Sequence, residues 1–238
     1  MAIVQYLPVL VILMVGTVLA VATNKLTTPA GMIGAFLGLL IFLAGGYAGI
    51  AMLAMFFALG TMATSWKLNQ KAHLGLAETD KGRRSVGEVV ANAGVPAILG
   101  LVGLAFPPHT SLMQVMIAAS FASATADTLS SELGNVYGTR FFNILTLKKD
   151  TRGLNGVVSI EGTLIGIAGS AIIAIVYYVA YGLFTHLWII IVAGTVGNIS
   201  DSLLGATLER SGHLNNNRVN FLNTAIAACC CLIILCSI

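Results

Sequence analysis

The chain has 238 residues, of which 57% are hydrophobic and 9% are charged, and its formal net charge is +3. Soluble globular proteins carry about 25% charged residues, so this chain has too few charges to cover a water-facing surface. The composition therefore excludes an ordinary soluble domain. It predicts a polytopic membrane protein whose surroundings are a lipid bilayer, with no nucleic acid as partner.

The first predicted element is a helix near residues 6–22. The stretch "MAIVQYLPVLVILMVGTVLAVATNK" has no basic segment before its apolar run, and the run is too long for a signal peptide, so we expect a retained helix. Apolar sequence then continues over residues 29–65, too far for one crossing of a bilayer core of about 30 Å. The motif "AGGY" at residues 44–47 predicts a turn between helices at 29–44 and 47–64.

Five more apolar segments complete the predicted bundle. They lie near residues 86–105, 111–131, 157–183, 187–207 and 219–237. A helix needs roughly 17–25 apolar residues to cross a membrane, and each segment is long enough. The sequence therefore predicts an all-α fold, a polytopic transmembrane helix bundle of about eight helices that forms one domain over residues 1–238.

The basic residues support this division. All 12 Lys and Arg residues fall in four connections, which follow the first, third, fifth and seventh predicted helices. In an eight-helix chain these connections lie on one side of the membrane, and the positive-inside rule makes that side cytoplasmic. We therefore expect a multi-pass protein of a prokaryotic inner membrane, with both termini outside and the functional site facing the cytoplasm.

Two carboxylates lie within apolar helices. Asp127 and Asp201 are each followed by more apolar sequence and flanked by hydroxyl or amide side chains, in "ADTLSSE" and "NISDS". A carboxylate at mid-bilayer costs at least about 2.5 kcal/mol, and a solvated helix end is the simpler interpretation. We favour that interpretation for Glu78 and Glu209. For the two aspartates we favour a polar cavity open to the cytosol, where hard oxygen ligands suit Mg²⁺.

A weak internal repeat of two helices connects the same residues. The segment "VGEVVANAG" resembles "NGVVSIEGT", which places Asn92 opposite Glu161. The segment "ATADTLSS" resembles "NISDSLLG", which places Asp127 opposite Asp201. Two such helix pairs could bring their acids together at a bundle interface. Chance similarity between helices rich in Gly and Ala is the alternative.

Two basic segments are candidates for phosphate binding. "TDKGRRS" places Arg83 and Arg84 just before a predicted helix, and "LKKDTRG" supplies Lys148, Lys149 and Arg152 before another. Topological anchoring and attraction to anionic lipid explain most of these charges. Gly82 beside the arginine pair favours phosphate binding, because helix N-terminal amides and guanidinium groups can hold phosphate together.

Four ordered motifs carry a family resemblance. "KAHLGLAETDKGRRSVGEVVANAG", "ADTLSSELG", "GLNGVVSIEGTLIG" and "GNISDSLLGATLE" with "NNNRVNFLNT" span about residues 50–225. They resemble the integral-membrane family that includes vertebrate transmembrane protein 19 and plant phytyl-phosphate kinase. "SIEGT" is also similar to a V-E-G-T motif of dolichol and phytol kinases. The resemblance implies phosphoryl transfer from a nucleoside triphosphate, with CTP expected, to an isoprenoid monophosphate.

The residue roles below follow from that implication. Phosphoryl transfer depends on positioning, metal and positive charge around the transferring oxygens. We expect three residues to bind Mg²⁺, namely Asp127, Glu132 and Asp201, while Glu161 joins them or orients the acceptor. The residues expected at the nucleotide or the acceptor phosphate are Arg83, Arg84, Asn92, Ser131, Lys149, Arg152, Asn198 and Asn220.

Two other functions fit the same residues. A proton- or cation-coupled transporter would use the repeat for alternating access, although only His109 and His186 are ionisable in the predicted outer half. A lipid-phosphate cytidylyltransferase would use the same acids and bases, and the sequence does not separate it from a kinase. The acceptor lipid and its chain length also stay open.

Overall fold

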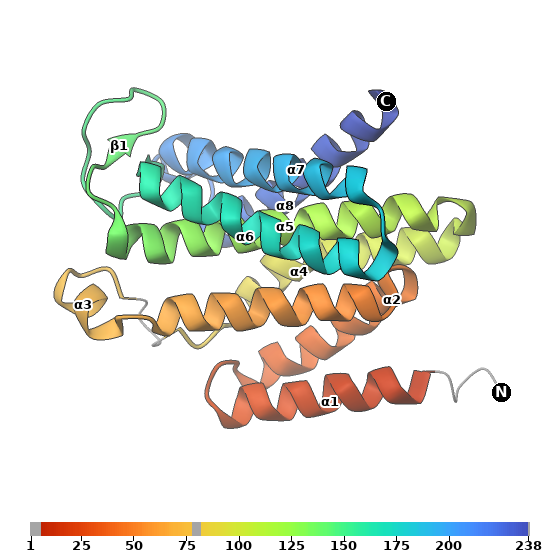
Figure 1. The fold of residues 1–238 in the computed structure, drawn as a ribbon. Helices are drawn as coiled ribbons and strands as arrows, with labels where there is room; N and C mark the ends of the chain where they lie inside the picture. Colours follow the sequence, from red (N-terminus) through yellow and green to blue (C-terminus); the bar gives the residue numbers. More distant parts are fainter. Residues whose placement is uncertain (1–5, 78–81, 238) are drawn as a thin grey trace.

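The structure is a computed structural model that describes residues 6–77 and 82–237. Within these residues long helices form a bundle, as predicted, with one small pair of strands (Figure 1). Six of the described helices are long and apolar enough to cross a membrane, and α1 (Leu7–Ala22) is a shorter apolar helix of 16 residues. The protein is therefore a multi-pass, all-α membrane bundle.

Helix α2 (Thr28–Ser65) is a hairpin of two helical arms. Gly46 interrupts it with φ 54° and ψ −152°, a conformation that glycine adopts without strain. The Leu53 side chain lies 3.4 Å from the position of a Cβ atom on Gly38, whereas these residues would be about 22 Å apart along a straight helix. The predicted turn at residues 44–47 is confirmed.

The remaining long helices match the predicted segments with small shifts, whereas α3, two short helical turns and a pair of strands were not predicted. The helices are α3 (Leu68–His73), α4 (Val86–Ala105), α5 (Thr110–Tyr137), α6 (Ile160–Tyr181), α7 (Phe184–Leu204) and α8 (Asn216–Ser237). A 3₁₀ turn, Pro107–His109, precedes α5, and a π-helical turn, Gly205–Glu209, follows α7. The strands are β1 (Phe142–Asn143) and β2 (Val157–Val158), which pair antiparallel.

Two of the shifted boundaries bear on the polar end of the bundle. The sixth helix was expected from residue 157, but Val157 and Val158 pair with β1, and α6 begins after Ser159. The Ser159 hydroxyl accepts a 3.0 Å hydrogen bond from Gly162 N and so caps the helix. The fifth helix was expected to end at residue 131 but continues to Tyr137, so Glu132 lies within its last turns.

Helix α5 lies at the centre of the bundle. Every residue from Ser120 to Ala126 is buried, and these residues are mostly small, which lets neighbouring helices approach closely. A Cβ atom on Gly134 would lie 2.9 Å from Gly162 Cα, so α5 and α6 come into near backbone contact. This packing brings the polar end of α5 against its neighbours.

The two ends of the bundle differ in the elements and the basic residues that lie there. Figure 1 shows the start of α1 and the end of α8 at one end, and α3 and β1 at the other. The basic segments predicted to share one side belong to the end with α3 and the strand pair. The assignment of that end to the cytoplasm stays a prediction from the positive-inside rule.

Candidate functional site

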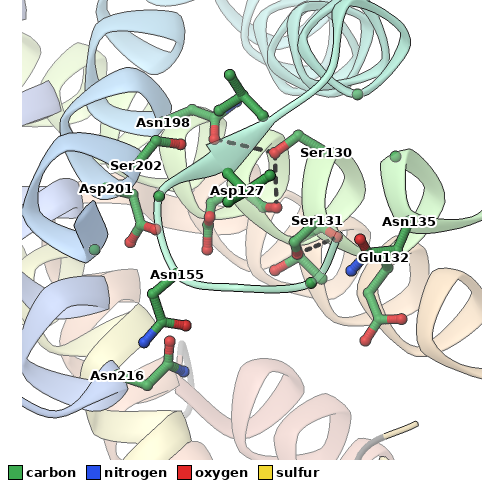
Figure 2. A pocket seen from close by; sticks show the side chains of 18 of the residues that line it. Asp127, Ser130, Ser131, Glu132, Asn135, Asn155, Asn198, Asp201, Ser202 and Asn216 are labelled. Atoms are coloured by element: carbon green, nitrogen blue, oxygen red, sulfur yellow. Dashed lines mark hydrogen bonds between the residues drawn. The ribbon is translucent and has the colours of Figure 1, made fainter. Parts of the chain in front are cut away.

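A polar cavity lies where α4, α5, α7 and α8 meet the loop of residues 138–159. Its volume is about 310 Å³, and hydroxyl, amide and carboxyl side chains dominate its wall (Figure 2). Eight of the twelve residues singled out in the sequence line it: Arg84, Asn92, Asp127, Ser131, Glu132, Asn198, Asp201 and Asn220. The four that do not line it are Arg83, Lys149, Arg152 and Glu161.

The carboxyl groups of Asp127 on α5 and Asp201 on α7 both line the cavity and lie close enough for electrostatic interaction. Figure 2 shows the two side chains facing the same space. Two neighbouring carboxylates repel each other unless a proton or a cation lies between them. Their pairing therefore makes this part of the cavity suited to a shared proton or a bound cation.

Helix α8 holds Asp201 in place. Asn223 Nδ2 donates a 2.8 Å hydrogen bond to Asp201 Oδ1, and Asn223 Oδ1 accepts a 3.1 Å bond from Ser123 Oγ on α5. The amide group of Asn220 lies 3.3 Å from the same Oδ1 and donates to it when its nitrogen faces the carboxylate. Three helices thus fix the orientation of one carboxylate.

Ser130 and Asn198 join the two aspartate-bearing helices. Ser130 Oγ on α5 lies 3.1 Å from Asn198 Oδ1 on α7 and 3.0 Å from the backbone oxygen of Asp127. A Cβ atom on Gly166 of α6 would lie 2.6 Å from Asn198 Nδ2, so a glycine leaves room for that amide. This contact fixes the helices at the level of the carboxyl pair.

Asn92 on α4 presents an unused hydrogen-bond acceptor. Its side chain is 6% exposed, and Nδ2 donates a 2.9 Å bond to Glu88 O. Its Oδ1 is buried and has no partner in the described part of the chain. Leaving a buried polar atom unpaired costs about 1–3 kcal/mol. Asn92 therefore supplies an oxygen that a bound molecule or ion could satisfy.

Glu132 is separated from the aspartate pair by its own ion pair. Its carboxylate binds Lys71, whose side chain is 1% exposed and also donates to Ala63 O at 3.0 Å and Thr64 O at 2.7 Å. Figure 2 shows Glu132 pointing away from Asp127. Within residues 6–77 and 82–237, no group of three or more His, Cys, Asp or Glu could hold a metal ion. The expected three-carboxylate set is thus not assembled, because Lys71 engages its third member.

Glu161 lies outside the cavity wall. Its Oε1 accepts hydrogen bonds from Thr139 Oγ1 at 2.6 Å and Thr139 N at 3.2 Å. The proposed repeat pairs Glu161 with Asn92, yet Asn92 lines the cavity and Glu161 does not. The other repeat pair, Asp127 and Asp201, does meet.

Of the basic residues singled out, Arg84 reaches the cavity. Its guanidinium group lies 4.9 Å from the Phe56 ring centre. Arg83 Nε instead donates a 3.3 Å bond to Leu26 O in the connection between α1 and α2. Arg152 donates a 3.4 Å bond to Val136 O, and Lys149 is exposed on the loop. Arg83 therefore joins two connections and Arg152 joins its loop to the end of α5, while Arg84 faces the site.

Residues 138–159 form a roof that the sequence did not reveal. Residues 153–158 line the cavity, and a Cβ atom on Gly156 would collide with Ala206. Arg210 secures the roof by donating to Asp150 Oδ2 at 2.8 Å and Asn155 O at 2.6 Å. The backbone amide of Thr151, and then Arg210, hold the pKa of Asp150 below its ordinary value.

Glu209 also lines the cavity, contrary to its interpretation as a solvated helix end. It lies in the π-helical turn and is close enough to Asp201 for electrostatic interaction. A π-turn changes which residues face inward, so ordinary helical periodicity does not identify this residue. Glu78, assigned the same role in the sequence, lies outside the described residues.

Several known proteins are similar to this chain over most of its length. A chloroplastic protein named VTE6 from Arabidopsis thaliana is 32% identical over 209 residues, covering 84% of this chain and 63% of that protein. An uncharacterized membrane protein of Synechocystis is 34% identical over 88% of this chain and 83% of its own. Another, from Methanocaldococcus jannaschii, is 30% identical over 92% of this chain and 90% of its own. No solved structure matches.

The chain spans less than two thirds of the plant protein's length but most of each prokaryotic relative. The family described as "Integral membrane protein DUF92" matches residues 10–228, which include the whole cavity wall. This chain therefore belongs to the integral membrane protein family DUF92.

Proposed function

We propose that this protein transfers a phosphoryl group from a nucleoside triphosphate, with CTP as the expected donor, to an isoprenoid monophosphate. The observation that carries the proposal is that Asp127 and Asp201, from two different helices, line the same polar cavity of an apolar bundle. The family resemblance to phytyl-phosphate kinase, together with similarity to a chloroplastic relative, supports the choice of substrate class.

The oxygen atoms of the site fit a hard divalent cation. Asp127, Asp201 and the unpaired Oδ1 of Asn92 offer two carboxylates and one amide oxygen, the ligand types that Mg²⁺ prefers. When bound, Mg²⁺ would supply charge neutralisation at the phosphate oxygens. We therefore assign Asp127 and Asp201 as the residues that would hold it, with Asn92 as a candidate third ligand.

The surrounding residues would position the reacting groups. Arg84 would contact phosphate oxygens from the α4 side, since a guanidinium group suits phosphate geometry. Asn220 and Asn223 would keep the Asp201 carboxylate oriented, and Ser131 and Asn198 would complete the polar wall. An oxygen of the acceptor phosphate attacks the γ-phosphorus, and the nucleoside diphosphate leaves.

The cavity size limits what can bind inside it. A volume of about 310 Å³ lies at the lower end of the range of about 300–1,000 Å³ for ligand pockets. It suits phosphate groups but not a long hydrocarbon chain. The isoprenoid tail would therefore lie in the bilayer among the apolar helices, while its phosphate enters the cavity.

The test is product analysis with purified protein. Labelled CTP, Mg²⁺ and a panel of phytyl, geranylgeranyl and polyprenyl monophosphates should give an isoprenoid diphosphate and CDP. Asp127→Asn should abolish turnover, whereas Thr195→Val should retain it, because Thr195 on α7 lies outside the cavity wall and bonds Ile191 O within its own helix. Pyrophosphate release would indicate cytidylyl transfer instead. Solute flux through liposomes without nucleotide binding would indicate a transporter.

A further inference from the structure

The roof loop has a second face that carries exposed leucines. Residues 144–149, here called the leucine tip, follow β1 and include Leu145, which is 49% exposed, and Leu147, which is 75% exposed. The loop projects beyond the ends of α5 and α6 in Figure 1. Leu145 and Leu147 lie two residues apart and are rimmed by polar side chains, the arrangement found where an exposed apolar patch contacts a membrane.

The leucine tip is held in a defined shape. Leu147 has φ 54°, a left-handed conformation that costs a residue other than glycine about 1–3 kcal/mol. Its N–H donates a 2.8 Å hydrogen bond to Asn143 O. The Oδ1 atom of buried Asn143 accepts from Leu145 N at 3.0 Å and Thr146 N at 3.2 Å. One buried amide therefore keeps both leucines directed outward.

The charge next to the leucines is positive. Lys148 and Lys149 are exposed and follow Leu147 directly. The neighbouring acid, Asp150, is engaged by Arg210 and so does not neutralise them. Apolar side chains beside unpaired lysines are the combination that binds the interface of an anionic membrane.

Aromatic residues mark the membrane level near this loop. Trp66 at the end of α2 donates a 2.8 Å hydrogen bond to the hydroxyl of Tyr137 at the end of α5. Both side chains are about half exposed, and Lys67 lies 4.9 Å from the Tyr137 ring centre. Trp and Tyr gather at the headgroup level of a bilayer. The leucine tip begins seven residues after Tyr137, and β1, which leads into it, pairs with β2 directly before α6. The tip therefore lies at the same end of the bundle as Tyr137 (Figure 1).

We propose that the leucine tip docks on the anionic lipid surface beside the bundle. Leu145 and Leu147 enter the interfacial layer, and Lys148 and Lys149 bind lipid phosphates. Ile144 and Leu154 of the same loop line the cavity, so docking holds the cavity roof against the surface in which a lipid substrate would be dissolved. This inference stands without the proposed phosphoryl transfer.

The test places a tryptophan at the tip of the full-length protein. Leu147→Trp is made in a background with Trp66→Phe and Trp188→Phe, which removes both native tryptophans. The protein is reconstituted in vesicles of phosphatidylcholine with or without phosphatidylglycerol, and lipids brominated near the carbonyl end serve as quenchers. His213→Trp in the same background is the matched control, since His213 is exposed in the connection between α7 and α8.

We expect blue-shifted emission and strong quenching at position 147 and neither effect at position 213. Each lysine near an anionic surface contributes about five-fold to the attraction, so Lys148→Gln with Lys149→Gln should weaken the phosphatidylglycerol dependence by more than ten-fold. Leu145→Trp repeats the test if Leu147→Trp does not fold. Unquenched, water-like emission at both positions overturns the proposal, as does a shift that depends on protein density and not on lipid, which indicates a second copy.

Discussion

Asn223 and Asp201 are joined by a 2.8 Å hydrogen bond that connects α8 to the carboxyl pair. Asn223 is fully buried, and its other amide atom accepts from Ser123. Removing this side chain takes one hydrogen bond from Asp201 and one from Ser123, whose hydroxyl keeps its 3.3 Å bond to Asn223 O. The backbone packing of the three helices remains. The asparagine thus acts as a positioning residue for the proposed cation site.

Asn223→Ala should therefore weaken both folding and cation binding. Loss of a buried hydrogen-bond partner costs about 1–3 kcal/mol, and we expect that decrease in the free energy of unfolding together with a Mn²⁺ affinity at least ten-fold lower. Unfolding in mild detergent and Mn²⁺ titration measure the two effects. Asn217→Ala is the control, because Asn217 does not line the cavity. Unchanged Mn²⁺ affinity in Asn223→Ala would separate Asn223 from the site.

Lys71→Met should destabilise the protein strongly. It removes the partner of Glu132 and the donor to two carbonyl groups at the end of α2. Breaking a buried ion pair on one side costs about 3–5 kcal/mol. Adding Glu132→Gln should recover part of this loss, because no unpaired carboxylate then remains. A double-mutant cycle in urea measures it, and additive effects would show that the two residues are not coupled.

Asp127→Asn should make the apoprotein more stable while it abolishes turnover. The substitution keeps the side-chain shape and removes the repulsion between neighbouring carboxylates. Functional residues commonly cost stability, and replacing them gains about 0.5–2 kcal/mol. Thermal unfolding without divalent cations gives the comparison. If saturating Mg²⁺ stabilises the wild type and the variant equally, the aspartate does not contribute to cation binding.

The roof loop should loosen in strong acid. The pKa of Asp150 is lowered by the Thr151 amide and by Arg210, so the folded state favours the ionised carboxyl. The stability that ionised Asp150 adds to the folded state is fully present above the unfolded pKa of about 3.9. It is lost as the pH falls through the lower pKa of the folded state. Protease cleavage within residues 138–159 should therefore increase at low pH. The Asp150→Asn variant should be cleaved readily already at pH 7. If it resists the protease as well as the wild type does at pH 7, the Arg210–Asp150 contact does not hold the loop in place.

Asn92→Ala distinguishes a ligand-binding amide from a structural one. Its Oδ1 has no protein partner among the described residues, and its Nδ2 bonds the Glu88 carbonyl one turn back in the same helix. The substitution should therefore cost no more than the single hydrogen bond to Glu88 O, about 1 kcal/mol. Losing one hydrogen bond or one cation contact from a bound ligand should lower nucleotide affinity about ten-fold. Equilibrium binding of CTP with Mg²⁺, measured beside thermal unfolding, gives both values. A large loss of stability with unchanged affinity would contradict the assignment.

The fold could be predicted from the sequence because it depends on features that lie within short segments, namely the lengths of apolar runs and the positions of glycine turns. Apolar run lengths located the spans, and the double glycine at residues 45–46 located the turn inside α2. Burying apolar helices and avoiding unpaired backbone groups in lipid leave few alternatives to such a bundle.

The site was predicted only in part because its details depend on tertiary contacts. Asp127 and Asp201 share a chemical context visible in the sequence, and they meet. Lys71 comes from a short helix beyond α2, so its capture of Glu132 had no sequence pattern. Glu209 faces the cavity because of a π-turn, and Gly156 contributes backbone through a roof loop that is packed against Ala206. These relationships arise from packing and not from periodicity.

The most direct test of the central claim is Mn²⁺ binding, measured by electron paramagnetic resonance, to purified protein in the presence of CTP. The account predicts cation binding in the wild type and in Thr195→Val, and loss of that binding in Asp127→Asn and in Asp201→Asn. Wild-type Mn²⁺ affinity in both aspartate variants, with the fold intact by thermal unfolding, would contradict it.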